Sequence, residues 1–295
     1  MASLIELVKD LRERTGAGFA DCKKALEATG EDLEKAIDWL REKGIAKTAA
    51  KAGRVAAEGL AKVVVNGNKA AIVEVNSETD FTARNDMFKK MVDTVAETIL
   101  NSNVTTVEEA LELPTANGKL SDEIAAISFA TGEKMTLRRF ELVNKTDDQI
   151  FGQYLHFDGK KGCIVVLNGD KEEVAKNIAM QIVGMNAQYV DRDSMPAEIV
   201  EHERAVQTEI VKNDEKNANK PEAIIAKMVE GKISKSLKDM CLVEQDYLLD
   251  PSMNVKTYLA NNGMSIAKFV RYSVGEGIEK KKDNWVEEVQ AALKG

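Results

Sequence analysis

Two short stretches of this 295-residue chain come near to phosphate-binding motifs, but neither is complete. A P-loop has the pattern G-x-x-x-x-G-K-[ST], in which backbone N–H groups hold the phosphates and the hydroxyl binds Mg²⁺. Gly152 and Gly159 have six residues between them, and Lys160-Lys161 supplies no hydroxyl. A dinucleotide fingerprint, G-x-G-x-x-G, would begin at Gly275, but Lys280 stands where its last glycine belongs.

Residues that commonly perform hydrolytic or metal-assisted catalysis are also scarce. The chain has two histidines, His156 and His202, and it lacks the G-x-S-x-G, H-E-x-x-H and C-x-x-C motifs. His202 stands in a charged helical stretch that is typical of solvated residues. Paired carboxylates such as Glu172-Glu173 fit exposed helix faces and give acid–base catalysis no support. We therefore expect a protein that is not an enzyme and that has no metal or other cofactor.

Composition narrows the possible partners and compartments. The chain has 41 basic and 49 acidic residues, a net charge of −8, which argues against direct nucleic-acid binding. No apolar run approaches the length of a membrane span, and the first residues do not resemble a secretory signal. Three widely spaced cysteines, Cys22, Cys163 and Cys241, suit buried free thiols in a reducing compartment. We expect a cytoplasmic protein without membrane contacts.

The first 54 residues predict a small head of three helices. Ser3 can cap a helix that ends near Thr15, and a second helix runs over about 19–28 and buries Phe19. A third runs over about 32–43, with Gly44 as its C-cap. An Ala- and Lys-rich tether follows. Because a core of this size is marginal alone, such a head is expected to bind something.

After residue 55 the pattern changes to a β-hairpin, a helix and a third strand, and this scheme occurs twice. In the first copy the hairpin turns at Asn66-Gly67 and the strand lies within 132–143. Its helix covers about 85–100 and has an apolar face formed by Phe88, Met91, Val92, Val95 and Ile99. The second copy has its hairpin at 154–167, turning at Asp158-Gly159, its helix at 172–185 and its strand within 263–274. The chain therefore resembles a duplication of two α+β halves.

Spacing between the copies reveals an insertion. Gly67 and Gly159 are 92 residues apart, whereas Gly132 and Gly263 are 131 apart, so the second half carries 39 extra residues. The best candidate is 193–235, a two-helix hairpin that we interpret either as a partner or dimer contact or as a tolerated insertion. A homodimer is therefore left open.

These observations predict an α+β fold with antiparallel strands, built as a duplicated α/β sandwich with a UBA-like helical head. The expected domains are a head and tether at 1–54, a first core half at 55–143, a second core half at 144–192 and 236–274, the helical hairpin at 193–235, and a short helical tail at 275–295.

One segment of the first half has no counterpart in the second. The first half goes from strand to helix through residues 76–84, where the second has only Asn168-Gly169-Asp170. The longer segment contains Phe81, which either packs on the following helix as a hydrophobic staple or stands exposed to fill a partner's pocket. On physical grounds we favour the packed ring, and the sequence leaves both alternatives open.

Three separated segments resemble signatures of the bacterial elongation factor Ts family. They are LRERTGAGFADCKKAL at 11–26, EVNSETDF at 74–81 and FVRYSVGEGIEK at 269–280. The resemblance covers essentially the whole chain in the family's order. It implies a guanine-nucleotide exchange factor that releases GDP from the translational GTPase elongation factor Tu.

The resemblance also implies roles for individual residues. Thr79, Asp80, Phe81 and Thr82 would form the segment that disturbs the Mg²⁺ and phosphate site of the GTPase, with Phe81 as a wedge. Arg12 and the Phe19-Ala20 corner would grip its nucleotide-binding domain. The chain departs from the family at Thr82, where Val is most frequent, and at Ala20, where a large apolar residue is frequent. We therefore expect weaker contacts at these two positions and an unchanged mechanism.

A structural adaptor is the main alternative from another functional class. It would have the same docking head and rigid core but no effect on the nucleotide of its partner. Accelerated nucleotide release from a GTPase would distinguish the two functions, because an adaptor predicts none.

Overall fold

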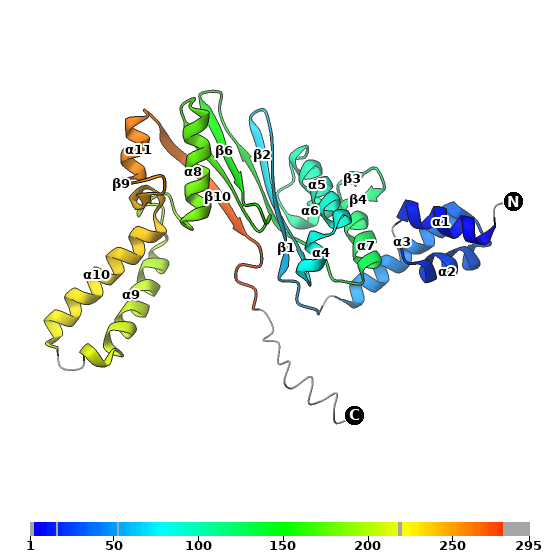
Figure 1. The fold of residues 1–295 in the computed structure, drawn as a ribbon, viewed down its shortest axis with the longest axis horizontal. Helices are drawn as coiled ribbons and strands as arrows, with labels where there is room; N and C mark the ends of the chain where they lie inside the picture. Colours follow the sequence, from blue (N-terminus) through cyan, green and yellow to red (C-terminus); the bar gives the residue numbers. More distant parts are fainter. Residues whose placement is uncertain (1–2, 16, 52, 218–219, 280–295) are drawn as a thin grey trace. The chain divides into compact units, whose positions relative to one another are not determined.

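The computed structural model describes residues 3–15, 17–51, 53–217 and 220–279, and it has an α+β fold (Figure 1). The chain divides into two compact units. The first unit consists of Met1–Val64, Val73–Leu142 and Tyr272–Gly295, and the second of Val65–Ile72 and Val143–Arg271. None of the described helices is both long and apolar enough to cross a membrane. Most of the predicted helical tail, from Lys280 onward, lies outside the described residues.

Three helices open the first unit: α1 (Leu4–Thr15), α2 (Phe19–Thr29) and α3 (Leu33–Ala50). At the start of α1 the backbone N–H of Glu6 donates to Ser3 Oγ, and the N–H of Ser3 donates to the Glu6 carboxylate. This reciprocal arrangement is a capping box, as the expected Ser3 cap requires. One apolar core joins the three helices to an aromatic ring from helix α7 (Leu120–Thr131), and it consists of Val8, Leu11, Ala17, Cys22, Ala25, Leu26, Ala36, Leu40 and Phe129.

Two expectations about these helices are wrong. Gly44 does not end the third helix, because α3 continues through residues of good helix propensity to Ala50. Its lack of a side chain instead permits close packing, since a Cβ there would lie 3.5 Å from the Cβ of Phe129 on α7 (Leu120–Thr131). Phe19 is 52% exposed rather than buried, because it opens α2 outside the apolar face that Cys22 and Leu26 contribute to the core.

The first sheet consists of β1 (Glu58–Asn66), β2 (Lys69–Ser77) and β5 (Thr136–Asn144), in the order β1-β2-β5. Its hairpin turns at Gly67-Asn68, one residue later than expected, because β1 continues through Asn66 and Gly67 adopts a φ of +57°. Positive φ is readily accessible to glycine, which explains its place in this turn.

The predicted amphipathic helix of the first half is α5 (Asp86–Leu100), which Asn85 caps by accepting from the backbone N–H of Met87. The apolar face expected from the sequence is confirmed, since Phe88, Met91, Val92, Val95 and Ile99 are all buried. Three short elements connect α5 to α7: α6 (Val107–Leu111), β3 (Pro114–Thr115) and β4 (Gly118–Lys119).

The second sheet consists of β6 (Gln149–Leu155), β7 (Lys161–Asn168) and β10 (Ser265–Ser273), in the order β10-β7-β6. In both sheets the third strand therefore lies beside the second strand of the hairpin, as a duplication predicts. The helix α8 (Glu172–Gly184) packs along β6 and β7 (Figure 1). The expectation that Phe157 belongs to a strand is wrong, because it lies in the turn of this hairpin and is 92% exposed.

The second unit also contains two long antiparallel helices, α9 (Ala197–Lys212) and α10 (Glu222–Met240) (Figure 1). Their contact is apolar and includes Val211, Val229, Ile233 and Leu237. Three apolar residues of these helices are substantially exposed, namely Val206, Ile210 and Ile224. The chain then returns through a short 3₁₀ turn (Leu242–Glu244), β8 (Asp246–Tyr247), β9 (Asp250–Asn254) and α11 (Val255–Asn261) to β10.

Candidate functional site

The segment that only the first half possesses forms a short helix, α4 (Asp80–Arg84), directly after β2. Thr79 is its N-cap, and its side-chain oxygen accepts from the backbone N–H of Thr82 at 3.3 Å. Ser77 Oγ donates to the carbonyl of Thr79 at 2.9 Å and fixes the exit from the strand. A short helix therefore lies within the segment 76–84 that leads from the strand to the long helix. We call residues 79–84 the α4 corner.

Phe81 projects from the α4 corner with 83% of its surface exposed. The packed alternative, in which this ring staples the following helix, is therefore wrong for this structure. Two other residues of the corner secure it instead, since Thr82 and Ala83 are 8% and 2% exposed. Asp80 is partly exposed and pairs with Arg84 at 2.9 Å within the same turn. The corner thus presents one aromatic ring and the Asp80–Arg84 ion pair, supported by the buried Thr82 and Ala83.

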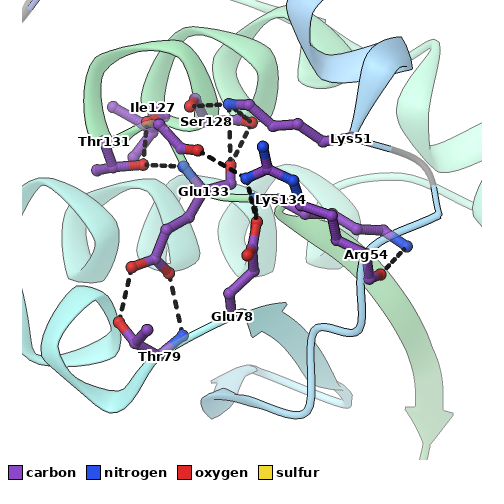
Figure 2. Close-up of polar contacts among 10 residues, drawn as sticks. Lys51, Arg54, Glu78, Thr79, Ile127, Ser128, Thr131, Glu133 and Lys134 are labelled. Carbon is purple, nitrogen blue, oxygen red and sulfur yellow. Dashed lines mark hydrogen bonds and ion pairs between the residues drawn. The ribbon is translucent and has the colours of Figure 1, made fainter. Parts of the chain in front are cut away.

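Glu133, in the turn between α7 and β5, holds the beginning of the α4 corner (Figure 2). Thr79 donates to both oxygens of this carboxylate, through its backbone N–H at 3.0 Å and its Oγ1 at 2.7 Å. The preceding Glu78 accepts from the backbone N–H of Lys134 and pairs with Arg54 at 3.2 Å. Two successive residues are thereby tied to one turn.

A buried carboxylate lies farther back along β2. Glu74 is fully buried, and it accepts from Arg138 Nη1 at 3.0 Å, Arg139 Nε at 2.6 Å and the backbone N–H of Gly275 at 2.8 Å. Burial alone raises the pKa of a carboxyl group, but the Gly275 N–H and the two guanidinium groups outweigh it, so that the pKa of Glu74 is lowered. At neutral pH the Glu74 carboxylate therefore holds the chain that follows β10.

Gly275 is needed at this contact for two reasons. Its φ is +74°, and a Cβ there would lie 2.2 Å from the carbonyl oxygen of Ala57. The first glycine of the incomplete dinucleotide motif thus allows a close approach of two backbone segments.

The residues expected to contact a partner from the head are all exposed. Arg12 lies in the last turn of α1, whereas Phe19 and Ala20 lie in the first turn of α2. The cysteines have the opposite environment, since all three are free and buried. Burial raises the pKa of Cys241 to about 11 and also raises the pKa of Cys22 and Cys163. Burial therefore disfavours the reactive thiolate form of all three cysteines.

The residues that the structure describes offer no metal centre. Among them, no three His, Cys, Asp or Glu side chains are grouped so that they could hold a metal ion. What the α4 corner can do chemically is to insert an apolar ring and a carboxylate into another molecule's site. Any effect on a partner's metal ion would come from such contacts.

Sequence reasoning missed the residues that support the corner, Glu133, Glu78 and Arg54. Glu133 is 54 positions from Thr79, and no periodicity or motif links the two. Glu74 belongs to the segment at 74–81 that resembles the family signature. The sequence of this strand, however, does not reveal that both faces of β2 are buried.

Two comparisons with protein families identify the chain. Residues 78–276, more than half of the chain, match the family model described as "Elongation factor TS". Residues 1–48 match the model described as "Elongation factor Ts, mitochondrial, N-terminal". The matches span both the helical head and the segment that carries the α4 corner. The chain therefore belongs to the elongation factor Ts family and is a nucleotide exchange factor for elongation factor Tu in translation elongation, not an enzyme.

Proposed function

We propose that the α4 corner is the part of the chain that opens the nucleotide site of elongation factor Tu. The observation that carries this proposal is the 83% exposed ring of Phe81 on a capped turn that is secured by two buried residues, Thr82 and Ala83. Exposed aromatic side chains that fill a partner's pocket commonly dominate the energy of an interface. A ring supported in this way can act as a wedge.

The four residues of the predicted segment have different roles in this proposal. Phe81 enters an apolar pocket of the GTPase, and Asp80 provides hydrogen bonding and charge beside the Mg²⁺ and phosphate site. Asp80 is available because exposed pairs such as Asp80–Arg84 contribute only about 0.3–0.5 kcal/mol. Thr79 and Thr82 hold the corner in shape, since one caps the turn and the other is buried.

Exchange by this route needs no chemistry from the factor itself. A nucleotide bound at nanomolar affinity has a binding free energy of about −12 kcal/mol, and each loss of about 1.4 kcal/mol raises its Kd about tenfold. Linkage makes the effect reciprocal: bound nucleotide lowers the affinity of elongation factor Tu for the exchange factor by the same ratio as the factor lowers its affinity for the nucleotide. Either ligand can then dissociate from the three-component complex.

We also propose a division of binding among the other segments. The head (1–54) grips the nucleotide-binding domain of the partner through Arg12, Phe19 and Ala20, and the exposure of these residues supports this role. The second core half (144–192 and 236–274) holds another domain of the partner. The tail from Gly275 returns to the nucleotide-binding domain.

Release of a fluorescent GDP analogue from elongation factor Tu tests the proposal. In millimolar Mg²⁺ we expect substoichiometric amounts of the chain to accelerate release strongly. With Mg²⁺ chelated, the relative acceleration should fall at least about tenfold, because the contact that the corner disturbs is already absent. Equal acceleration in both conditions would contradict the proposed action on the Mg²⁺ site, and no acceleration in either would favour the adaptor.

The compartment follows from the bacterial resemblance. We infer that the chain is of the bacterial type and acts in the cytoplasm, and the three signature segments support this inference. The head also matches a family model described as mitochondrial. Localisation in source cells is the test, and finding the chain in a mitochondrial matrix would overturn the inference.

A further inference from the structure

We propose that Glu133 is a positioning residue for nucleotide exchange, because its carboxylate fixes the orientation of the α4 corner and hence of Phe81. This inference rests on the proposed function of the corner. Glu133 is expected to act through Thr79 and Phe81, without touching the nucleotide or the metal ion.

The geometry of the contact restrains rotation as well as position. The backbone N–H of Thr79 donates to Oε2 of Glu133 at 3.0 Å, and Thr79 Oγ1 donates to Oε1 at 2.7 Å (Figure 2). The same Oγ1 accepts from the N–H of Thr82, on the buried side of α4. The first turn of α4 is thus connected to Glu133 through a single side chain.

The corner needs this support because neither its length nor its aromatic ring provides it. An isolated five-residue helix is unstable in water, since the nucleation of one turn is unfavourable. Phe81 makes few contacts that could orient it, given its 83% exposure. Its direction therefore follows from the backbone of α4. Binding is favoured when the contacting group is already held in its bound orientation.

Glu133 can act as an anchor because its own backbone is restrained. Gly132 ends α7 with a φ of +79°, a conformation that glycine adopts without strain, and its N–H donates to the Ser128 carbonyl at 3.0 Å. Lys51, which is buried, donates through Nζ to the Ser128 carbonyl at 2.7 Å and to the Glu133 carbonyl at 3.4 Å (Figure 2).

A second set of contacts keeps the surrounding chain in place if Glu133 is changed. Arg54 Nη1 lies 3.2 Å from Glu78 Oε1 and 3.3 Å from the carbonyl oxygen of Gly132. Lys134 Nζ donates to the Arg54 carbonyl at 2.9 Å. Because none of these contacts uses the Glu133 side chain, removal of the carboxylate should free the corner without unfolding the unit.

The test compares Glu133→Ala and Glu133→Gln with Glu97→Ala, which removes an exposed carboxylate from α5. With elongation factor Tu bound to a fluorescent GDP analogue and saturating factor, we expect Glu133→Ala to slow release about five- to tenfold. Glu133→Gln keeps the side-chain length and can form two neutral hydrogen bonds with Thr79, so its GDP release rate should fall by less than about threefold. Glu97→Ala should match wild type, and affinity for nucleotide-free partner should be nearly unchanged in all three.

Amide hydrogen exchange in the free protein supplies a readout that does not depend on the partner. Glu133→Ala should raise the exchange rates of the amides at 79–84 about five- to tenfold and leave those of α5 unchanged. Unaltered exchange at 79–84 would overturn the positioning role. Release and affinity falling by the same factor would also overturn it, because that result indicates a general structural defect.

The double variant Glu133→Ala/Phe81→Ala separates this inference from the proposed function. If Glu133 acts through Phe81, the double variant should release GDP no more slowly than Phe81→Ala alone. If the two single substitutions slow release independently, so that their factors multiply in the double variant, Glu133 does not act through Phe81 and the inference is overturned. Normal release with Glu133→Ala but slow release with Phe81→Ala would reject Glu133 and retain the wedge. Normal release with Phe81→Ala would reject the proposed function itself.

Discussion

Replacing Phe81 by alanine should slow GDP release from elongation factor Tu about tenfold to hundredfold at saturating factor. The ring is 83% exposed, so its loss should leave no cavity and should hardly change the melting temperature of the free protein. The affinity for nucleotide-free partner should change much less than the release rate, because the head and the second core half still bind. Stopped-flow release of a fluorescent GDP analogue measures the effect.

Phe157→Ala is a matched control for this experiment. Phe157 is another exposed aromatic residue, 92% exposed in the turn between β6 and β7. Its truncation should leave the release rate at saturation within about threefold of wild type, whatever it does to affinity. If Phe81→Ala releases GDP at the wild-type rate while remaining folded, the wedge assignment is wrong. If Phe81→Ala and Phe157→Ala slowed GDP release equally, the effect would be a general one of losing an exposed aromatic ring.

Of the single substitutions proposed, Glu74→Gln should lower the free energy of unfolding the most, by about 3 kcal/mol at pH 7. The change removes the charge from a fully buried group that two arginines and the Gly275 N–H surround. The pKa of Glu74 is lower in the folded chain than in the unfolded chain. Stability from its ionised form is therefore fully present above the unfolded pKa of about 4.3 and is lost as the pH falls through the native pKa.

Denaturant unfolding of wild type and Glu74→Gln from pH 7 to pH 3 tests this expectation. The difference in free energy of unfolding between the two should remain constant above about pH 5.5 and should narrow below about pH 4. Glu97→Gln should show no comparable difference at any pH, since that carboxylate is exposed. A difference that grows as the solution is acidified would contradict the assignment.

Local patterns predicted the elements whose residues interact with near neighbours in sequence. The spacing of Phe88, Met91 and Val95 predicted the buried face of α5, and Ser3 predicted the start of α1. In contrast, Gly44 was misjudged because glycine favours both helix ends and close helix packing. Only the position of Phe129, on a distant helix, distinguishes these two uses.

The candidate site was only partly predictable for a related reason. The sequence located residues 79–82, but whether Phe81 packs or projects depends on which residues the α4 corner buries, and those proved to be Thr82 and Ala83. Glu133 could not be found because four helices (α4 to α7) and two short strands (β3 and β4) separate it from Thr79 in the chain, and all of them must be placed before the contact exists. Contacts between distant residues leave no periodic signal in a single sequence.

The contact between Glu74 and Gly275 also constrains how the protein is made. These residues are 201 positions apart, and the chain between them includes all of the second unit except residues 65–72. At 5–20 residues per second, synthesis of this stretch takes about 10–40 s. During that interval the nascent first unit lacks the Gly275 N–H, which is one of the hydrogen-bond donors to its buried Glu74 carboxylate. The first unit is therefore completed only after the second unit has been translated.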